Sequence, residues 1–437
     1  MFPEHKLLIQ LSTESMNRGN ILPLLFESEI DWKFFVSEAS VHGIAPLLDH
    51  VIKTQDLGSI IPQFVQEQLS QQRQQAALYQ MFLHQETKNI LEKFRESSVN
   101  TLLFKGATLS HDTYEESSLR PSSDIDILVR KADLPRIQDI MFKCGFTFSE
   151  EMLPVQFYYQ NHFHLAYQKK LKMCSIVIEI HWHLMDKYLM QATDLESIWQ
   201  RRIPFAFDGV ESSKFSLEDE CIYLALHTYK HGYMNHLIAR QENLDLFFHP
   251  FAENKLMWFV DLEKILIKKN QSISWDTITE RTQNWCVDQA VLSIFTILDK
   301  LYPNLPLPQS YLQTFSLIGS LPWVKTKLFK TILNTSYTKG RSAQQRGFAQ
   351  FLQKHFFTMK GELQFRLIRV IDLIEYMFPS PRFIKRLYAL THLHPVVICL
   401  YFPYVYPIHF IKTVSEHMFG LLQWIYYSIQ KRINHGR

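Results

Sequence analysis

The chain has 437 residues and a formal net charge of +3, and 46% of its residues are hydrophobic while 20% are charged. This composition is typical of a soluble globular protein with room for about two or three domains. Because the charge is nearly balanced, no broad basic surface is expected, which disfavours polymerisation on a nucleic-acid template. The low glycine content, 13 residues, favours a largely helical chain.

The cysteines and the termini bear on location. The five cysteines, at positions 144, 174, 221, 286 and 399, include no CxxC pair, so we expect free thiols in a reducing cytoplasm. The N-terminus has no long apolar run typical of a secretory signal.

The most apolar stretch, VVICLYFPYVYPIHFI at residues 396–411, is shorter than the roughly 20 residues of a spanning helix and is interrupted by prolines. We expect a buried element or docking surface there, with peripheral membrane contact through residues 396–429 as the alternative.

Residues 1–96 predict helices. The segments 31–53 and 65–94 have apolar residues at helical spacing, and the second is rich in glutamine. From Val99 the period changes, because NTLLFKG at residues 100–106 is a short apolar run that ends in glycine. Such a run is typical of a strand followed by a turn.

Two acids interrupt the apolar run DIDILV at residues 124–129. In a strand, Asp124 and Asp126 share one face, and the aliphatic residues between them pack on the other. Buried acids are unfavourable without a partner, so the pair predicts half of a metal site. Their charges repel, so at least one carboxyl should have a raised pKa. For the same reason, Asp126→Asn is expected to leave the stability of the metal-free protein unchanged or slightly higher.

The next predicted strand, SIVIEIHWHL at residues 175–184, carries a third acid. On it Glu179, His181 and His183 share one face. If the two acidic strands are neighbours, Glu179 converges with the two aspartates. Carboxylate oxygens suit Mg²⁺, and two such ions roughly 3.5–4 Å apart would activate an attacking hydroxyl and stabilise a leaving pyrophosphate. We expect the histidines to flank this site rather than to hold zinc.

The segment LLFKGATLSHDTY, residues 102–114, predicts a phosphate-binding turn. Gly106 permits a close approach of the backbone to a phosphate, and the helix that follows offers free N–H groups. Lys105 and Arg120 are the cations expected to neutralise a triphosphate.

The order of elements defines the fold class. A helix is predicted after Asp133 and is stopped by Gly145, and from about Leu217 onward the pattern is helical again. The chain therefore predicts an α+β fold with a small mixed β-sheet. The predicted regions are a helical N-terminal region at 1–96, a catalytic core at 97–212 and a helical C-terminal region at 213–437.

These motifs resemble a known group of enzymes. KGATL followed by RPSSDIDILV and a distal acid resembles the signature of the nucleotidyltransferase superfamily with the DNA polymerase β-like catalytic fold. More narrowly, the chain resembles the bacterial uncharacterised nucleotidyltransferase family. That narrower resemblance is carried by HGIAPLLDH (42–50), EIHWHL (179–184), the pair His227 and His231, Trp258 with Asp261, and MFPSPRF (377–383).

The resemblance implies transfer of a nucleoside monophosphate from a nucleoside triphosphate, with ATP expected, to a hydroxyl-type acceptor with release of pyrophosphate. It implies Mg²⁺ as cofactor, held by Asp124, Asp126 and Glu179, which are also the catalytic residues. The implied nucleotide-binding residues are Lys105, Gly106, Ala107, Thr108 and Arg120. The turn departs from the superfamily's usual Gly-Ser or Gly-Gly, so a hydroxyl contact to phosphate is missing or moves to Thr108.

The resemblance leaves several alternatives open. The acceptor is a small molecule, a glycan precursor or a protein, and neither the base nor the oligomeric state is specified. The rival function is a nucleotide-binding regulatory or assembly protein on a catalytically weak nucleotidyltransferase scaffold, because a fold does not fix a function. We expect further residues in the pocket wall, with a satisfied core histidine or a helix cap as the ordinary alternative: His181, His183, His227, His231 and Asp261.

Overall fold

A computed structural model describes residues 1–316, apart from positions 17, 28, 286 and 304, most of 150–161 and 233–253, and all of 186–192. The described residues up to Leu312 belong to one compact unit. The predictions for the apolar segment 396–411 and for residues 396–429 lie outside the described residues, as do those for Cys286, Cys399 and the helical pattern beyond 316.

The N-terminal region is helical, as predicted. Its longest helix, α5, begins after Pro62 and contains neither glycine nor proline, so nothing in its sequence interrupts it over 34 residues. One face of α5 is buried through Leu83, Ile90 and Phe94. The helices are α1 (Pro3–Ser12), α2 (Arg18–Glu27), α3 (Trp32–Val41), α4 (Ala45–Thr54) and α5 (Gln63–Glu96).

A mixed sheet of seven strands follows, in the order β3-β4-β5-β2-β1-β7-β6. The pairs β2–β5 and β1–β7 are parallel, and the remaining neighbours are antiparallel. This confirms the α+β class. The strands are β1 (Leu102–Phe104), β2 (Asp124–Leu128), β3 (Thr147–Phe148), β4 (His164–Lys170), β5 (Ser175–His181), β6 (Ile203–Phe207) and β7 (Val210–Lys214). The elements between them are α6 (Gly106–Asp112), η1 (Ser117–Leu119), η2 (Lys131–Asp133), α7 (Leu134–Lys143) and α9 (Leu195–Arg201).

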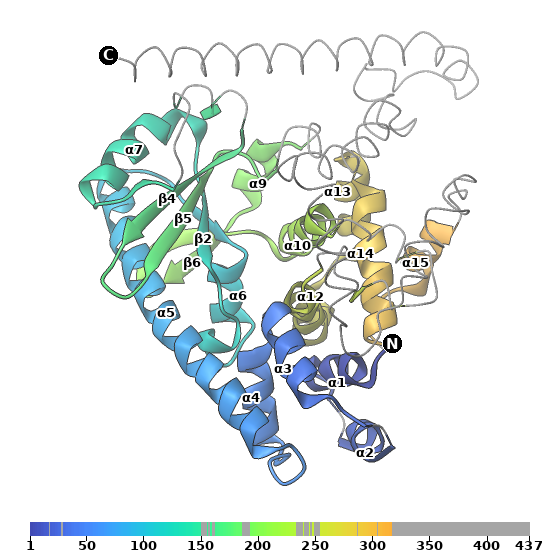
Figure 1. The fold of residues 1–437 in the computed structure, drawn as a ribbon. Helices are drawn as coiled ribbons and strands as arrows, with labels where there is room; N and C mark the ends of the chain where they lie inside the picture. The colour runs from blue at the N-terminus through green and yellow to red at the C-terminus, as the bar shows by residue number, and fades with distance from the viewer. Residues whose placement is uncertain are drawn as a thin grey trace, which may run out of the picture. The chain divides into compact units, whose positions relative to one another are not determined.

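The two faces of the central strands differ as the alternation predicts. Ile125 and Ile127 of β2 and Ile178 of β5 pack in one core with residues of α5 and α7. Burial of each such side chain stabilises the fold by roughly 1.5–3 kcal/mol. Figure 1 shows α5 and α7 on one side of the sheet and α10 on the other. A shift of β2 by one residue would turn Asp126 into the apolar core, so the hydrophobic pattern fixes the register.

The described part of the C-terminal region is helical, as expected from Leu217 onward. Ser216 begins α10 by accepting a hydrogen bond from the backbone N–H of Asp219. Within the described residues, no helix has both the length and the apolar character needed to cross a membrane. The elements are α10 (Leu217–His231), α12 (Leu256–Lys269), η4 (Asn270–Ser272), α13 (Trp275–Asn284), α14 (Asp288–Leu301) and α15 (Gln309–Ser316).

Candidate active site

The acidic strands are neighbours, and the expected adjacency is confirmed. In the parallel pair β2–β5, Asp126 lies directly opposite Glu179. His181 joins them: its Nε2 lies 2.9 Å from Asp126 Oδ1 and 3.1 Å from Glu179 Oε2. Asp124 is on the same strand two residues earlier, and its Oδ1 accepts a hydrogen bond of 3.0 Å from Ser123 Oγ. The sheet therefore brings the predicted carboxylates to one face.

Lys105 lies in the turn between β1 and α6 and has an unusual backbone conformation, with φ 54° and ψ −130°. Residues other than glycine rarely adopt this backbone conformation, which is less favourable by about 1–3 kcal/mol. The turn directs the Lys105 ammonium to Asp126, and Nζ donates a hydrogen bond of 2.6 Å to Oδ1. Burial opposes the charge, but the negative charge of Asp126 raises the pKa of Lys105 above its usual value. The ammonium is therefore kept charged at the centre of the site.

The two aspartates have opposite electrostatic environments. Burial and the charge of Asp126 together raise the pKa of Asp124 to about 6. For Asp126, burial favours the neutral acid, but the charge of Lys105 and the hydrogen bond to His181 outweigh it and hold the pKa well below its usual value. The expectation that at least one carboxyl has a raised pKa is confirmed, and the affected residue is Asp124.

Gly106 packs closely against the segment 120–122. A Cβ at this position would lie 1.8 Å from Ser122 Oγ and 2.5 Å from Arg120 Nη1, so only glycine lets the segment 120–122 pack against the turn. The described contact of Gly106 is therefore with the protein's own chain. Its neighbour Ala107 is buried in the hydrophobic core.

Thr108 does not supply a free hydroxyl to the turn. Its Oγ1 lies 3.1 Å from the Lys105 carbonyl oxygen and 3.1 Å from Glu220 Oε1 on α10. Thr108 is fully buried, because α6 turns its side chain toward α10. A phosphate contact by Thr108 therefore stays a prediction, and in this structure its hydroxyl contacts the protein's own chain.

Arg120 is also bound to the protein rather than free for a triphosphate. It donates to Asp261 on α12, with Nη2 to Oδ2 at 2.8 Å and Nε to Oδ2 at 3.2 Å. The Tyr114 hydroxyl donates to Asp261 Oδ1 at 2.7 Å, and Arg120 Nη1 donates to Ser122 Oγ at 2.7 Å. Asp261 is fully buried, so this network ties the segment 120–122 to α12. Nucleotide binding by Arg120 and a place for Asp261 in the pocket wall stay predictions, and in this structure the two residues form one ion pair.

The predicted histidines divide into separate groups. On α10, the rings of His227 and His231 are 4.6 Å apart, and the Trp258 ring is 5.2 Å from His227. Burial, together with the charge of Lys105, lowers the pKa of His227 well below its usual value. His183 lies beyond the end of β5, so the alternation no longer applies, and its Nδ1 lies 3.0 Å from the Met185 carbonyl.

His183 lines a cavity whose lining does not include the three carboxylates. This cavity has a volume of about 360 Å³, and Arg130, Trp182 and Trp199 also line it. Among the predicted pocket-wall residues, the structure thus brings only His181 into hydrogen-bond contact with the carboxylates.

Sequence reasoning missed His164, which contacts the site from β4. It pairs with His181 across the antiparallel ladder, and the two rings stack at 4.9 Å with an interplanar angle of 18°. Its Nε2 lies 3.8 Å from Glu179 Oε1. Burial and the neighbouring His181 lower the pKa of His164 to about 3. The run HLAYQKK has weak strand alternation, and that gave no signal strong enough to place His164 beside β5.

Two carboxylates and one imidazole lie close enough together to hold a divalent cation. One ligand atom each from Asp126, Glu179 and His181 lies within 4.8 Å of the others. His181 Nδ1 is buried and has no hydrogen-bond partner among the described groups, so this ring is not fixed from behind. In this structure, Lys105 and His181 neutralise the carboxylate that a cation would otherwise neutralise. Asp126 and Glu179, with Asp124 beside them, offer the oxygen ligands that Mg²⁺ prefers.

Comparison with solved structures finds an antigenic nucleotidyltransferase-like protein from Paracoccidioides brasiliensis. The two chains share 13% identity, with a TM-score of 0.34, and the match covers 53% of this chain and 92% of that one. Comparison with curated proteins finds no match. The family model described as uncharacterised nucleotidyltransferase matches residues 28–303, and the chain therefore belongs to the uncharacterised nucleotidyltransferase family.

Proposed function

We propose that this protein is a metal-dependent nucleotidyltransferase that moves a nucleoside monophosphate from a triphosphate, with ATP expected, to a hydroxyl-type acceptor. The observation that carries the proposal is the juxtaposition of Asp126 and Glu179 across β2 and β5, with Asp124 on the same face. A strained lysine that contacts one of these acids adds to it, because strain of this kind is concentrated at functional sites.

The reaction forms one bond and breaks one. The acceptor oxygen bonds to the α-phosphorus, the bond from that phosphorus to the bridging oxygen breaks, and pyrophosphate leaves with the electron pair. The acceptor proton is given to a base. Glu179 is available as this base in its ionised form, because the hydrogen bond with His181 outweighs the effect of burial and lowers the pKa of Glu179.

Asp124, Asp126 and Glu179 would hold the cation, with two ions expected. When bound, Mg²⁺ supplies charge neutralisation to the phosphates and to the attacking oxygen. Lys105 would then exchange its hydrogen bond with Asp126 for one with a phosphate oxygen, which keeps its ammonium paired throughout. His181 and His164 would hold Glu179 in position from one side.

The test combines binding and transfer on the full-length protein. Thermal shift is measured with each of the four triphosphates, with and without Mg²⁺, because a ligand at 100 times its Kd stabilises by roughly 2.7 kcal/mol. We then incubate the protein with α-labelled triphosphate and follow transfer of the label to small-molecule, glycan-precursor and protein fractions. Glu179→Gln should lose transfer, whereas the control Glu211→Gln, an exposed acid on β7, should keep it.

The same experiment distinguishes the proposed transferase from the rival function, a nucleotide-binding regulatory protein. A triphosphate that stabilises the wild type without label transfer to any fraction would favour a nucleotide-binding regulatory protein. The absence of any Mg²⁺-dependent stabilisation would contradict both readings. Equal transfer by the wild type and Glu179→Gln would remove Glu179 from the reaction.

A further inference from the structure

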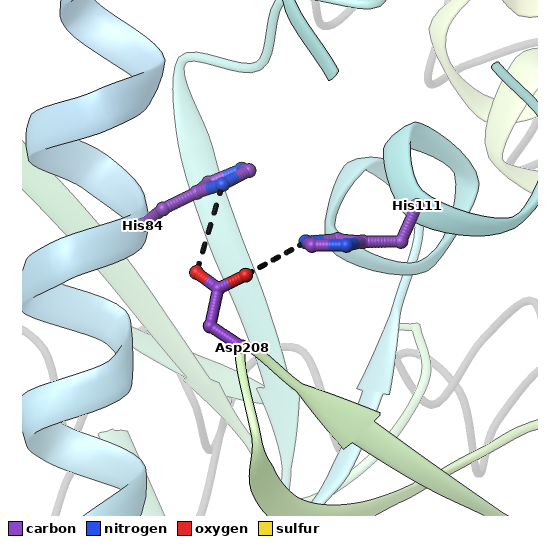
Figure 2. Close-up of side chains that lie close together, drawn as sticks. All are labelled: His84, His111 and Asp208. Atoms are coloured by element: carbon purple, nitrogen blue, oxygen red, sulfur yellow. Dashed lines mark ion pairs between the residues drawn. The ribbon is translucent and has the colours of Figure 1, made fainter. Parts of the chain in front are cut away.

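We propose that His84, His111 and Asp208 form a second metal site, which takes a divalent transition metal of the Zn²⁺ class. The three residues come from α5, α6 and the turn between β6 and β7, and their side chains point toward one another (Figure 2). The proposal does not depend on the nucleotidyl transfer proposed above.

The distances leave room for an ion. His84 Nδ1 lies 3.9 Å from Asp208 Oδ2, and His111 Nε2 lies 3.8 Å from Asp208 Oδ1. These separations exceed hydrogen-bond lengths, so neither imidazole nitrogen is directly hydrogen-bonded to the Asp208 carboxylate. One ligand atom from each residue lies within 4.8 Å of the others. Metal bonds of about 2.0–2.1 Å would require each imidazole nitrogen to approach the carboxylate by about 0.5 Å, while the two imidazole nitrogens would close from a separation of up to 4.8 Å.

The surrounding residues hold the three side chains in place. Asp208 and Gly209 both have positive φ, 46° and 83°, the combination that a tight two-residue hairpin turn requires. This turn fixes Asp208 at the tip of the hairpin. The Phe207 ring is fully buried and contacts both imidazoles, at 5.2 Å from His84 and 4.9 Å from His111. Backbone geometry and packing therefore hold the three side chains close together, with the two imidazole rings stacked 5.2 Å apart.

The donor types select the metal. Two imidazoles and one carboxylate suit Zn²⁺ and its neighbours in the transition series, whereas Mg²⁺ prefers oxygen ligands. His111 and Asp208 are 26% and 36% exposed, so the ion would keep a coordination position open to water. His84 faces Asp208 through Nδ1, and its other ring nitrogen, Nε2, is buried with no hydrogen-bond partner in the described part of the chain.

A bound ion would join three elements. α5 crosses the sheet, β6–β7 forms its edge, and α6 begins immediately after Lys105. His111 lies in the last turn of α6, so the ion would anchor the outer end of the helix whose inner end positions the strained lysine.

The experiment measures Zn²⁺ binding to the metal-free full-length protein by titration calorimetry. The variants are Asp208→Asn and His111→Gln. Asparagine tolerates positive φ, so the first variant should keep the turn. The control is His50→Gln, because His50 also pairs with a carboxylate, Glu115 at 3.2 Å, but belongs to no three-residue cluster among the described residues. A melting curve in EDTA verifies that each variant is folded.

We expect the wild type and His50→Gln to bind one more equivalent of Zn²⁺ than either cluster variant, or to bind it at least about tenfold more tightly. Mg²⁺ should not compete for this equivalent. If Asp208→Asn does not fold, His111→Gln decides the outcome. Equal stoichiometry and affinity in all four proteins, or equal losses in His50→Gln, would overturn the proposal and indicate adventitious surface binding only.

Discussion

Two clusters of histidine and carboxylate lie within the described residues, and they differ in how fully their members are paired. At the centre of the sheet, Asp126, Glu179 and His181 lie at hydrogen-bond distances of 2.9 and 3.1 Å, and Lys105 adds a fourth group. At the sheet edge, His84, His111 and Asp208 stay 3.8–3.9 Å apart. Similar residue types therefore give a buried, directly hydrogen-bonded network in one place and a more exposed set of side chains without direct hydrogen bonds between them in the other.

Burial explains the difference. Asp126 is 2% exposed, so its charge must be balanced by the protein whenever no cation is present. Asp208 is 36% exposed, and water can solvate it. Removal of a carboxylate should therefore have a large effect at the centre and a small one at the edge, and this contrast can be measured.

The largest effect is expected for Asp126→Asn. This variant leaves the Lys105 ammonium buried without its carboxylate partner, which should destabilise the metal-free protein by about 3 kcal/mol. Nucleotide transfer should fall at least about a hundredfold. Urea denaturation and a transfer assay measure the two quantities. A variant as stable as the wild type would show that the Lys105–Asp126 contact contributes nothing to folding.

This prediction reverses the one made from the sequence. Alternation along β2 correctly gave the face of each aspartate, because it depends only on local periodicity. The sign of the change for Asp126 depends instead on Lys105, which lies beside it only because Phe104 pairs with Asp126 across β1 and β2. Burial and the charge of Asp126 raise the pKa of Asp124, whereas Lys105 and His181 hold the pKa of Asp126 below its usual value.

The second effect concerns the strain at Lys105. Lys105→Met removes the ammonium and keeps a Cβ in the unfavourable backbone region, whereas Lys105→Gly removes both. Both variants should lose at least about tenfold in transfer, if the ammonium pairs with phosphate. Relief of strain should make the glycine variant more stable than the methionine variant by about 1 kcal/mol. Equal melting temperatures would indicate that the backbone conformation at position 105 is not strained.

The contacts that could not be predicted from the sequence include pairs of residues that are far apart in the chain. Arg120 and Asp261 were both identified as candidates, but they are separated by 141 positions and no local pattern links them. The β6–β7 hairpin was missed although Asp208-Gly209 is a strong hairpin signal. The adjacency of β2 and β5 was predictable, because both strands carry acids on an otherwise apolar face.

The third effect has the opposite sign and depends on pH. Burial and the charge of Asp126 raise the pKa of Asp124 to about 6 in the folded protein, above the usual value of 3.8. The ionised carboxyl therefore destabilises the metal-free fold at neutral pH, and this penalty disappears as pH falls through 6 toward 4. Asp124→Asn should be more stable than the wild type by about 1–2 kcal/mol at pH 7.5, and the gain should vanish near pH 4. A gain that does not change with pH would show that Asp124 ionisation is not the cause.

The smallest effect is expected at the sheet edge and completes the contrast. In EDTA, Asp208→Asn removes a solvent-exposed carboxylate whose oxygens lie 3.8–3.9 Å from the nitrogens of two imidazoles. Exposed ion pairs of this kind contribute about 0–1 kcal/mol, and asparagine keeps the positive φ of the turn. We expect a change of less than about 0.5 kcal/mol in the free energy of unfolding, measured by urea denaturation alongside Asp126→Asn. If the Asp208 variant lost as much stability as the Asp126 variant, Asp208 would have a structural role in the metal-free protein, and the distinction between a hydrogen-bonded central cluster and an open outer one would not hold.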